Sequence, residues 1–176
     1  MRAERITLWG NSGSGKSTLA EQMAREFGLP VFHVDKIAWT AGWIYRNEPD
    51  FLNEHRGWVE RPRWIIEGVG HLSGMRERFH RADAIIYLET PWELCRQRAQ
   101  RRIEEDRLSP DRFMADGCRY GDVVEKQWEV IDYFERWARP TIEGMIEAEF
   151  ADKIRIRLDG SKSTSEVMGE FRGVCG

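Results

Sequence analysis

The feature that most constrains the fold is a glycine-rich segment near the N-terminus. It fits the pattern G-x-x-x-x-G-K-[ST], with the fixed positions filled by Gly10, Gly15, Lys16 and Ser17. Glycines let the backbone turn sharply, at positive φ where needed, so that successive N–H groups point inward at phosphate oxygens. A short apolar strand formed by Ile6, Leu8 and Trp9 precedes the segment, and apolar residues at helical spacing follow it. The order of strand, loop and helix predicts a phosphate-binding loop.

Each residue type in this loop has an expected task toward ATP and Mg²⁺. Lys16 supplies a mobile positive charge for the β- and γ-phosphates, and the hydroxyl of Ser17 is placed to ligate Mg²⁺. The helix that begins there adds the positive end of its dipole. The residues expected to hold the nucleotide are Gly10, Asn11, Ser12, Gly13, Ser14, Gly15, Lys16, Ser17 and Thr18.

Length and composition limit the classes of protein that fit. The 176 residues suit one domain with a sizeable core, and the net charge of −3 argues against a general nucleic-acid binder. The basic residues are instead concentrated near the middle of the chain, which favours a local anion site; they include Arg96, Arg98, Arg101, Arg102 and Arg107. Three widely spaced cysteines predict neither a disulfide framework nor a zinc site. With no apolar leader or membrane-length segment, we expect a cytoplasmic monomer or homodimer without a membrane partner.

Two acids follow expected strands. Asp35 comes directly after a strand over residues 31–34, and Glu67 lies at the end of an apolar strand over residues 64–68. Because ligands of open α/β sheets bind outside the carboxyl ends of the strands, both acids are candidate catalytic residues. Glu67 is expected to hold the Mg²⁺ shell or orient a nucleophile, and Asp35 to face the phosphoryl acceptor. The alternatives are an aspartate that begins a turn and a simple strand-end charge.

Residues 36–63 form an expected insertion on the acceptor side, with a helix near residues 50–60. The segment is rich in aromatic residues, and Trp39 is a candidate for stacking on a planar substrate. Packing of a small subdomain explains the same aromatic residues. Further on, residues 70–81 read as a loop whose Arg78 would grip a substrate phosphate or carboxylate.

A strand over residues 84–88 leads to a helix that begins near Pro91. Arg98, Arg101 and Arg102 are expected on one face of this helix: Arg98 and Arg102 as catalytic residues closing over the phosphoryl group, and Arg101 binding the nucleotide. Exposed arginines of a solvated helix face are the alternative. The polar residues 103–121 predict a mobile lid.

The last part of the chain completes an alternating pattern. Residues 123–150 predict a helix interrupted at Pro140, with a buried stripe formed by Val124, Trp128, Ile131, Phe134 and Trp137. A strand over residues 153–158 and a helix over residues 164–171 follow. Five strands interleaved with helices predict a parallel α/β sheet.

The chain resembles the adenylate-kinase-related P-loop kinases, most closely the group named topology-modulation proteins. Besides the phosphate loop, the resemblance is carried by the elements Val34-Asp35-x-x-x-Trp39 with Gly42-Trp43, Trp64-Ile65-Ile66-Glu67-Gly68, Arg78-Phe79-His80-Arg81-Ala82-Asp83 and Arg98-Ala99-Gln100-Arg101-Arg102. It implies a P-loop NTPase fold of the nucleotide-kinase type, with five parallel strands in the order 2-3-1-4-5 and flanking helices. It also implies a short mobile lid carrying arginines and phosphoryl transfer from ATP.

Three functions remain open at this point. The leading interpretation is an ATP-dependent kinase that acts on a nucleoside or nucleotide. A small-metabolite kinase of the shikimate or gluconate type is the alternative within the same class, and Asp35 would then act as a base on a hydroxyl. A nucleotide-binding regulator of DNA topology belongs to a different class, and the acidic charge balance counts against it.

Overall fold

The computed structural model describes residues 3–175. At its centre lies a five-stranded sheet in which all neighbouring strands are parallel. In spatial order the strands are β2 (Val31–His33), β5 (Trp64–Glu67), β1 (Arg5–Trp9), β6 (Ala84–Glu89) and β7 (Ile154–Asp159). Counted along the chain this order is 2-3-1-4-5, so the expected parallel sheet and its strand order are confirmed.

Helices cover both faces of this sheet and its carboxyl end. The longer ones are α1 (Lys16–Phe27), α3 (Glu48–Val59), α4 (Leu72–Arg81), α5 (Trp92–Asp106), α6 (Val124–Tyr133), α7 (Arg139–Glu149) and α8 (Thr164–Cys175). The short elements are α2 (Asp35–Ala38), the hairpin strands β3 (Trp39–Thr40) and β4 (Ile44–Tyr45), the 3₁₀ turn η1 (Tyr120–Asp122) and the π-helical segment η2 (Phe134–Ala138). None of the helices between residues 3 and 175 combines the length and apolar character needed to cross a bilayer.

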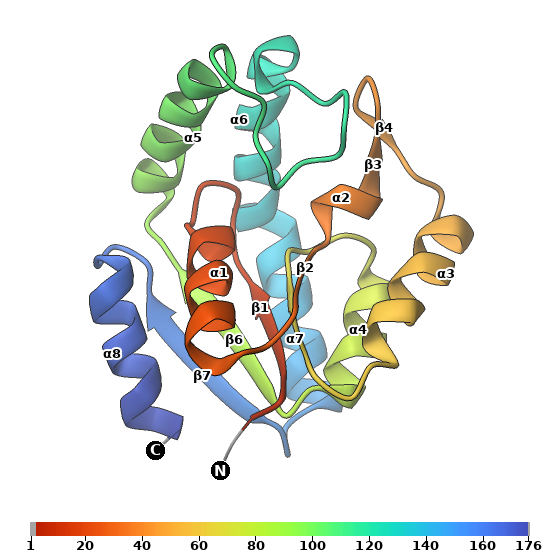
Figure 1. The fold of residues 1–176 in the computed structure, drawn as a ribbon, viewed down its shortest axis with the longest axis vertical. Helices are drawn as coiled ribbons and strands as arrows, with labels where there is room; N and C mark the ends of the chain where they lie inside the picture. The colour runs from red at the N-terminus through yellow and green to blue at the C-terminus, as the bar shows by residue number, and fades with distance from the viewer. Residues whose placement is uncertain (1–2, 176) are drawn as a thin grey trace.

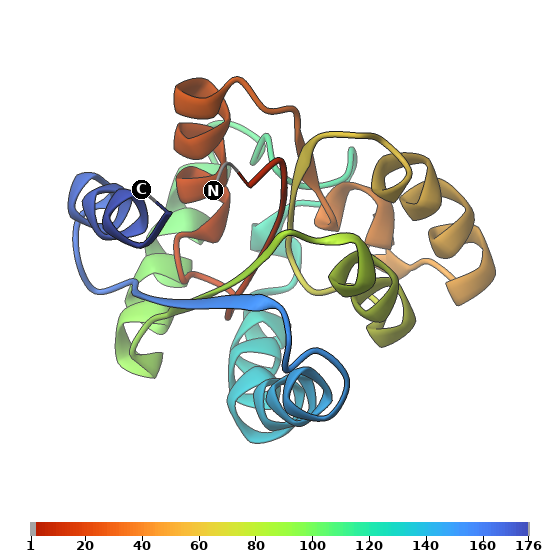
Figure 2. The same ribbon diagram turned by 90° about the horizontal axis from the view of Figure 1, so that it is seen from below.

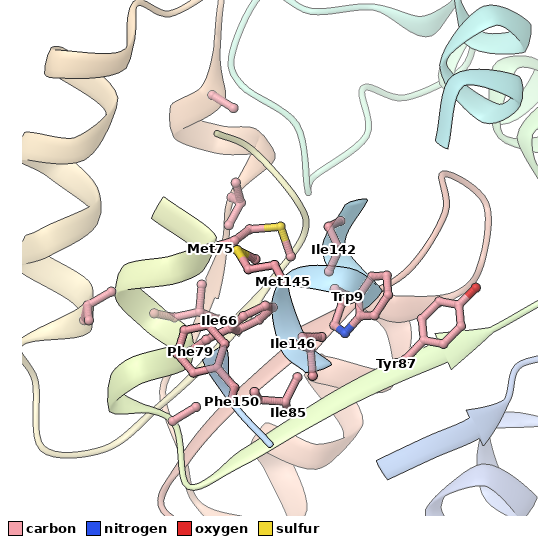
Figure 3. Packing of buried hydrophobic residues seen from close by; sticks show 14 of the residues in the cluster. Trp9, Ile66, Met75, Phe79, Ile85, Tyr87, Ile142, Met145, Ile146 and Phe150 are labelled. Carbon is pink, nitrogen blue, oxygen red and sulfur yellow. The ribbon is translucent and has the colours of Figure 1, made fainter. Parts of the chain in front are cut away.

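The strands alternate their side chains between two cores. Ile6 and Leu8 of β1 face α1 and α8, whereas Trp9 packs with residues of α4 and α7 on the opposite face. Figures 1 and 2 show α1 and α8 together on one side of the sheet and α7 on the other. Trp9 stacks on Tyr87 with ring centroids 4.2 Å apart, and Figure 3 shows both beside Ile142 and Ile146. Because both faces are covered, the central strands are apolar throughout.

Register places the acids at the phosphate loop. Leu8 pairs with Glu67 across β1 and β5, and His33 pairs with the same Glu67 across β2 and β5. The carboxyl ends of all three strands therefore meet where the phosphate loop begins. In Figure 1 this end lies at the top of the sheet, below α5, α6 and the hairpin β3–β4.

The segment expected as a loop at residues 70–81 is helix α4, so that expectation was wrong. Its three arginines have different surroundings. Arg76 forms an exposed ion pair with Glu149, Arg81 is exposed, and Arg78 is buried. The apolar residues Met75 and Phe79 recur four apart and pack into the core, which is the helical signal that the arginines obscured.

The helical segment after the lid is not interrupted at Pro140. α6 passes into η2 and then α7, with Pro140 in the first turn of α7. A proline ring clashes with the carbonyl four residues earlier, and wider π turns relieve such clashes. The wider turn also shifts the helical phase. Ile131 and Phe134 are buried as expected, but Trp137 is 64% exposed and does not belong to the stripe.

His55 on α3 is a titratable group in the apolar layer between α3 and α4. It is fully buried against Phe51, and neither ring nitrogen has a hydrogen-bond partner among the described residues. Burial, with smaller contributions from Arg78 and Arg56, lowers the pKa of His55 from 6.5 to about 3. The imidazole therefore stays neutral in the folded protein while it takes up a proton in the unfolded chain.

We expect His55 to make the protein less stable as the pH falls below 6.5. The unfolded chain binds a proton there that the folded protein binds only near pH 3, so this group alone lowers the free energy of unfolding by about 1.4 kcal/mol per pH unit. Urea unfolding at pH 7, 6 and 5 should show a shallower pH dependence for His55→Leu than for the wild type. The same substitution at the exposed His80 serves as the control. Equal slopes for the wild type and His55→Leu would contradict this assignment.

Candidate active site

The phosphate loop is built on glycines that no other residue can replace. Gly13 and Gly15 have φ values of 79° and 96°, in the left-handed region. A Cβ on Gly13 would lie 2.3 Å from the carbonyl oxygen of Cys95 in α5, and a Cβ on Gly10 would lie 2.7 Å from that of Leu88. The loop is therefore held against α5 and the end of β6 at distances that only glycine permits.

Lys16 and the N-terminus of α1 face a cavity of about 440 Å³, here named the phosphate cavity. In this structure Lys16 Nζ lies 3.4 Å from the backbone carbonyl of Asn11, within the loop. The first turn of α1 carries no acidic residue. The cavity is lined by Gly13, Gly15, Lys16, Ser17, Thr18, Asp35, Arg98, Arg102, Glu105, Asp106, Ser109, Pro110, Asp111, Phe113, Met114 and Tyr120. The helix dipole and Lys16 make one end of it suited to phosphate.

Ser17 and Glu67 are in direct contact. Ser17 Oγ donates a hydrogen bond of 2.9 Å to Glu67 Oε1, and His33 Nδ1 lies 2.7 Å from the same oxygen. Burial opposes ionisation of Glu67, but the hydrogen bond from His33 and the charge of Lys16 outweigh it and lower the pKa of this carboxyl. Its second oxygen, Oε2, is buried without a partner in the part of the chain that the structure describes.

A serine hydroxyl beside a carboxylate with an unpartnered oxygen fits Mg²⁺, a cation bound by oxygen ligands. Groups of three or more His, Cys, Asp or Glu with metal-binding geometry are absent from the described chain. Mg²⁺ in nucleotide sites needs only one or two protein ligands besides water and phosphate oxygens, so Ser17 and Glu67 suffice.

Sequence reasoning missed His33, which lies between Glu67 and Glu21. Its Nε2 is 3.3 Å from Glu21 Oε1, and its ring lies 4.8 Å from that of Phe113 in the lid segment. Burial disfavours its charged form, but the hydrogen bonds and charges of the two glutamates raise its pKa overall. A polar residue at the last position of β2, two before Asp35, was the available signal.

Asp35 begins α2 directly after β2 and faces the phosphate cavity. Burial raises the pKa of Asp35, Lys16 acts to lower it, and the negative charge of Glu67 raises it further. A carboxylate with a raised pKa is a better proton acceptor than a solvated one. Asp35 lies at the same edge of the sheet as Lys16, which agrees with the position expected from the strand order.

Two of the three expected arginines reach the phosphate loop from α5. Arg98 Nη1 donates to the carbonyls of Ser14 and Gly160, both at 2.9 Å. Arg102 Nη2 donates to Ser12 Oγ at 2.9 Å, and its guanidinium lies 4.0 Å from the ring centroid of Tyr120. Arg101 points elsewhere: it is exposed and pairs with Glu105 four residues later, so the three do not form one site-facing row.

A second cavity, of about 240 Å³, lies on the other side of Lys16 and Asp35 and is here named the aromatic cavity. Trp39, Trp43 and Tyr45 of the β3–β4 hairpin contribute to one wall, and Tyr133 and Phe134 to another. It is lined by Gly10, Asn11, Ser12, Lys16, Asp35, Ala38, Trp39, Trp43, Tyr45, Val69, Gly70, Met114, Tyr120, Gln127, Val130, Tyr133, Phe134 and Ala138. The two cavities share Lys16 and Asp35, and also Met114 and Tyr120 from the lid segment.

A third cavity, also of about 240 Å³, adjoins the phosphate loop on the β7 side. Gly15 and Arg98 line both this cavity and the phosphate cavity. Its remaining wall includes Gly160, Lys162 and Thr164 from the turn between β7 and α8. The phosphate loop thus lies between the aromatic cavity and this third cavity, whose lining is more polar.

Arg78, expected to grip a substrate, lies behind the wall of the aromatic cavity. It lines neither of the two cavities that share Lys16 and Asp35, and its Nη2 donates to the carbonyls of Gly68 and Val69. Burial lowers the pKa of Arg78 to about 9, against the opposing charges of Glu67 and Asp35. In this structure Arg78 braces the loop after β5, and its other two guanidinium nitrogens, Nε and Nη1, are buried without a partner among the described residues.

The expected lid at residues 103–121 begins as helix, because α5 continues to Asp106. The rest packs on the hairpin: Trp43 lies in a buried cluster with Met114, Cys118 and Tyr120. Trp43 Nε1 also donates to the carbonyl of Arg119 at 2.9 Å. The segment is polar in sequence, yet these few apolar side chains attach it to the aromatic cavity.

Asp106 ties both ends of the lid segment together. Its buried carboxylate accepts hydrogen bonds from the backbone N–H of Asp111 at 3.1 Å and of Tyr120 at 2.9 Å. It also pairs with Arg119, whose Nε lies 3.1 Å away. Nothing in the local sequence distinguishes Asp106 from the neighbouring acids Glu104 and Glu105.

Taken together, the fold and the phosphate loop define a P-loop NTPase of the nucleotide-kinase type. The family model described as "ATPase family associated with various cellular activities (AAA)" matches residues 6–109, more than half of the chain, so the protein belongs to this family. No curated protein matches the sequence.

Solved structures of kinases share the fold. Shikimate kinase from Acinetobacter baumannii, in complex with shikimate, is similar with a TM-score of 0.62 at 17% identity, covering 98% of this chain and 93% of that one. A sugar kinase from Janibacter sp. HTCC2649 has a TM-score of 0.59 at 17% identity, covering 99% and 95%. Shikimate kinase from Aquifex aeolicus has a TM-score of 0.54 at 18% identity, covering 95% and 92%. At these identities the likeness shows the fold alone.

Replacing Asp106 by Ala should loosen the lid segment while the sheet stays folded. The change leaves two backbone N–H groups and Arg119 without their buried acceptor, at a cost of about 1–3 kcal/mol per unpaired group. Hydrogen exchange should accelerate in residues 107–120 and not in β1 or β5. Asp116→Ala, an exposed position in the same segment, is the control. Unchanged exchange in Asp106→Ala would show that this carboxylate does not hold the segment.

Proposed function

We propose that the protein is an ATP-dependent kinase that transfers the γ-phosphoryl group of ATP to a hydroxyl of a small molecule. One observation carries this proposal: the phosphate cavity and the aromatic cavity meet at Lys16 and Asp35. A cation for the transferred group and a base for the acceptor are therefore adjacent, between the two places where the reactants would bind. Such positioning is the main source of rate enhancement in phosphoryl transfer.

The reaction follows from these two residues. Lys16 offsets the negative charge on the β- and γ-phosphate oxygens as the bond between the γ-phosphorus and the bridging oxygen breaks. The acceptor oxygen forms the new bond to phosphorus, and its proton passes to the carboxylate of Asp35. The raised pKa of Asp35 suits a group that must first be ionised and then hold a proton.

Ser17 and Glu67 are the residues that would hold Mg²⁺, directly or through its water shell. When bound, the cation supplies positive charge to the phosphate oxygens. Arg98 and Arg102 border the same cavity from α5 and would add charge-assisted hydrogen bonds to the phosphates. Their present partners are carbonyl or hydroxyl oxygens and an amide oxygen, which phosphate can replace. The third cavity offers a place for the rest of the nucleotide.

The acceptor is proposed as a nucleoside or nucleotide, with a shikimate- or gluconate-like metabolite as the alternative. The structural neighbours include a sugar kinase and a shikimate kinase bound to shikimate, which favours a small molecule as acceptor over a macromolecule. A regulator of DNA topology, as the name of the resembled group implies, gains no support from these comparisons.

The proposal is tested by ADP formation with Mg·ATP and a panel of nucleosides, nucleoside monophosphates, shikimate and gluconate. Turnover that depends on one acceptor, and that Lys16→Ala abolishes, is the expected result. Lys153→Ala, which removes a lysine bound to His80 and Ala82 carbonyls away from both cavities, should keep activity. Acceptor-dependent turnover that survives Lys16→Ala would refute the role of the phosphate loop. Nucleotide-dependent DNA binding without turnover would favour the regulator.

Substitution of the two acids should separate their roles. Glu67→Gln is expected to weaken the dependence on Mg²⁺ and lower turnover together, because Glu67 contacts Ser17. Asp35→Asn should leave the affinity for ATP nearly unchanged while lowering turnover by about 10²–10⁴-fold through loss of a base. Steady-state kinetics with varied ATP, Mg²⁺ and acceptor gives each quantity. Loss of ATP binding in Asp35→Asn, without any effect of Glu67→Gln, would reverse the two assignments.

A further inference from the structure

The charge distribution around the aromatic cavity distinguishes it from the phosphate cavity. Among its lining residues only Lys16 and Asp35 are charged, and both lie at the boundary with the phosphate cavity. The phosphate cavity, by contrast, is bordered by Lys16, Arg98 and Arg102 together with four acids. The inner part of the aromatic cavity therefore offers no cation to an anionic group of the acceptor.

Four basic side chains lie near this cavity without being part of its lining. Arg102 donates to Ser12 and Gln127 but borders the phosphate cavity, where it is assigned to the nucleotide phosphates. Arg78 lies behind its wall, bound to the carbonyls of Gly68 and Val69. Arg46 pairs with Glu54, and Lys126 lies 5.6 Å from the ring centroid of Trp39 without being part of the lining. A buried phosphate or carboxylate without a paired cation costs several kcal/mol, so an anionic acceptor is disfavoured here.

The pKa of Tyr45 also indicates that the cavity disfavours negative charge. Burial raises the pKa of Tyr45 to about 12, and the negative charges of Asp35 and Glu48 contribute to the rise. Burial, together with nearby negative charge, disfavours a tyrosinate here and also disfavours a phosphate or carboxylate on the ligand. The opposite would hold for a site evolved around a basic cluster.

The walls instead present aromatic rings that are partly exposed. Tyr133 is 62% exposed and Tyr45 is 44% exposed, although both line the cavity. Trp39 packs edge-on against Trp43 and Tyr45, at centroid distances of 5.4 and 4.8 Å. Exposed aromatic rings around a cavity are covered favourably by a flat ring of a ligand, which stacks on them and buries apolar area.

The volume limits the ligand to a small one. At about 240 Å³ the cavity is at or below the lower end of small-molecule sites, which span roughly 300–1,000 Å³. Asp35 is its one carboxylate and accepts a hydrogen bond, so it selects a hydroxyl group on the ligand. A small compound with one planar base and one hydroxyl-bearing sugar meets both requirements, the small volume and the hydroxyl group.

From these observations we infer that the phosphoryl acceptor is an uncharged hydroxyl compound with a planar ring, of the nucleoside class, and not a nucleoside monophosphate or a carboxylate. This inference rests on the proposed function and narrows it to one substrate class. The planar ring binds between the hairpin and the α6–η2 wall, and the hydroxyl binds at Asp35. The aromatic cavity thus disfavours the binding of anionic analogues of the substrate.

The test compares matched acceptors under the same Mg·ATP conditions. The probes are the common nucleosides, their 5′-monophosphates, free ribose and shikimate, and the measured quantity is kcat/KM for ADP formation. We expect at least one nucleoside to exceed its own monophosphate by about 10–100-fold, the factor for a charged group left without a partner. Free ribose should be a poor acceptor, because it lacks the planar base.

A positive charge added to the cavity wall sharpens the comparison. Tyr133→Arg adds a cation to the aromatic cavity and should lower the preference for nucleoside over monophosphate by at least about 10-fold. Trp137→Arg adds the same charge four residues later, at an exposed position that does not line the cavity, and should leave the preference unchanged. The two variants differ only in whether the charge faces the ligand.

The outcomes separate this inference from the proposed function. A monophosphate, shikimate or ribose preferred over every nucleoside, with turnover still lost in Lys16→Ala, would overturn the inference and leave the kinase in place. Equal preference changes in Tyr133→Arg and Trp137→Arg would also overturn it. Turnover that does not require Lys16 or Asp35 would overturn the proposed function itself.

Discussion

The close packing of the phosphate loop against α5 and β6 is the constraint on which the site depends. Gly13 touches the carbonyl of Cys95, and Gly10 approaches that of Leu88 at distances that exclude any side chain. Arg98 holds the same loop at Ser14, because its guanidinium donates a hydrogen bond to the Ser14 carbonyl. A loop held in this way before any phosphate arrives needs little further ordering when phosphate binds.

The parallel sheet explains why the candidate catalytic residues lie together at one edge. The register of β1, β5 and β2 brings Ser17, Glu67 and His33 into one hydrogen-bonded group, and it places Asp35 beside Lys16. The hairpin, the lid segment and α6 then close a second cavity on the far side of Lys16.

Local patterns predicted much of this structure. The glycine spacing indicated the phosphate loop, and apolar runs ending in acids indicated the strands and the edge that holds Asp35 and Glu67. Long-range packing was not predictable: Arg78 is buried because α4 packs on the core, and the π turn before Pro140 moves Trp137 to the surface. Arg101 and Arg102 are neighbours in sequence, yet only the tertiary fold decides which one reaches the loop. Asp106 could not be distinguished from the neighbouring acids Glu104 and Glu105 for the same reason, because its hydrogen bonds depend on the tertiary fold.

The central claim is that the nucleotide phosphates lie on Lys16 with their end directed at Asp35 and the aromatic cavity. A crystal structure with a non-hydrolysable ATP analogue and Mg²⁺ tests it most directly. We predict the terminal phosphate within hydrogen-bonding distance of Lys16 Nζ, the cation beside Ser17 and Glu67, and the aromatic cavity open to the acceptor. Phosphates bound away from Lys16, or a nucleotide base filling the aromatic cavity, would contradict the account.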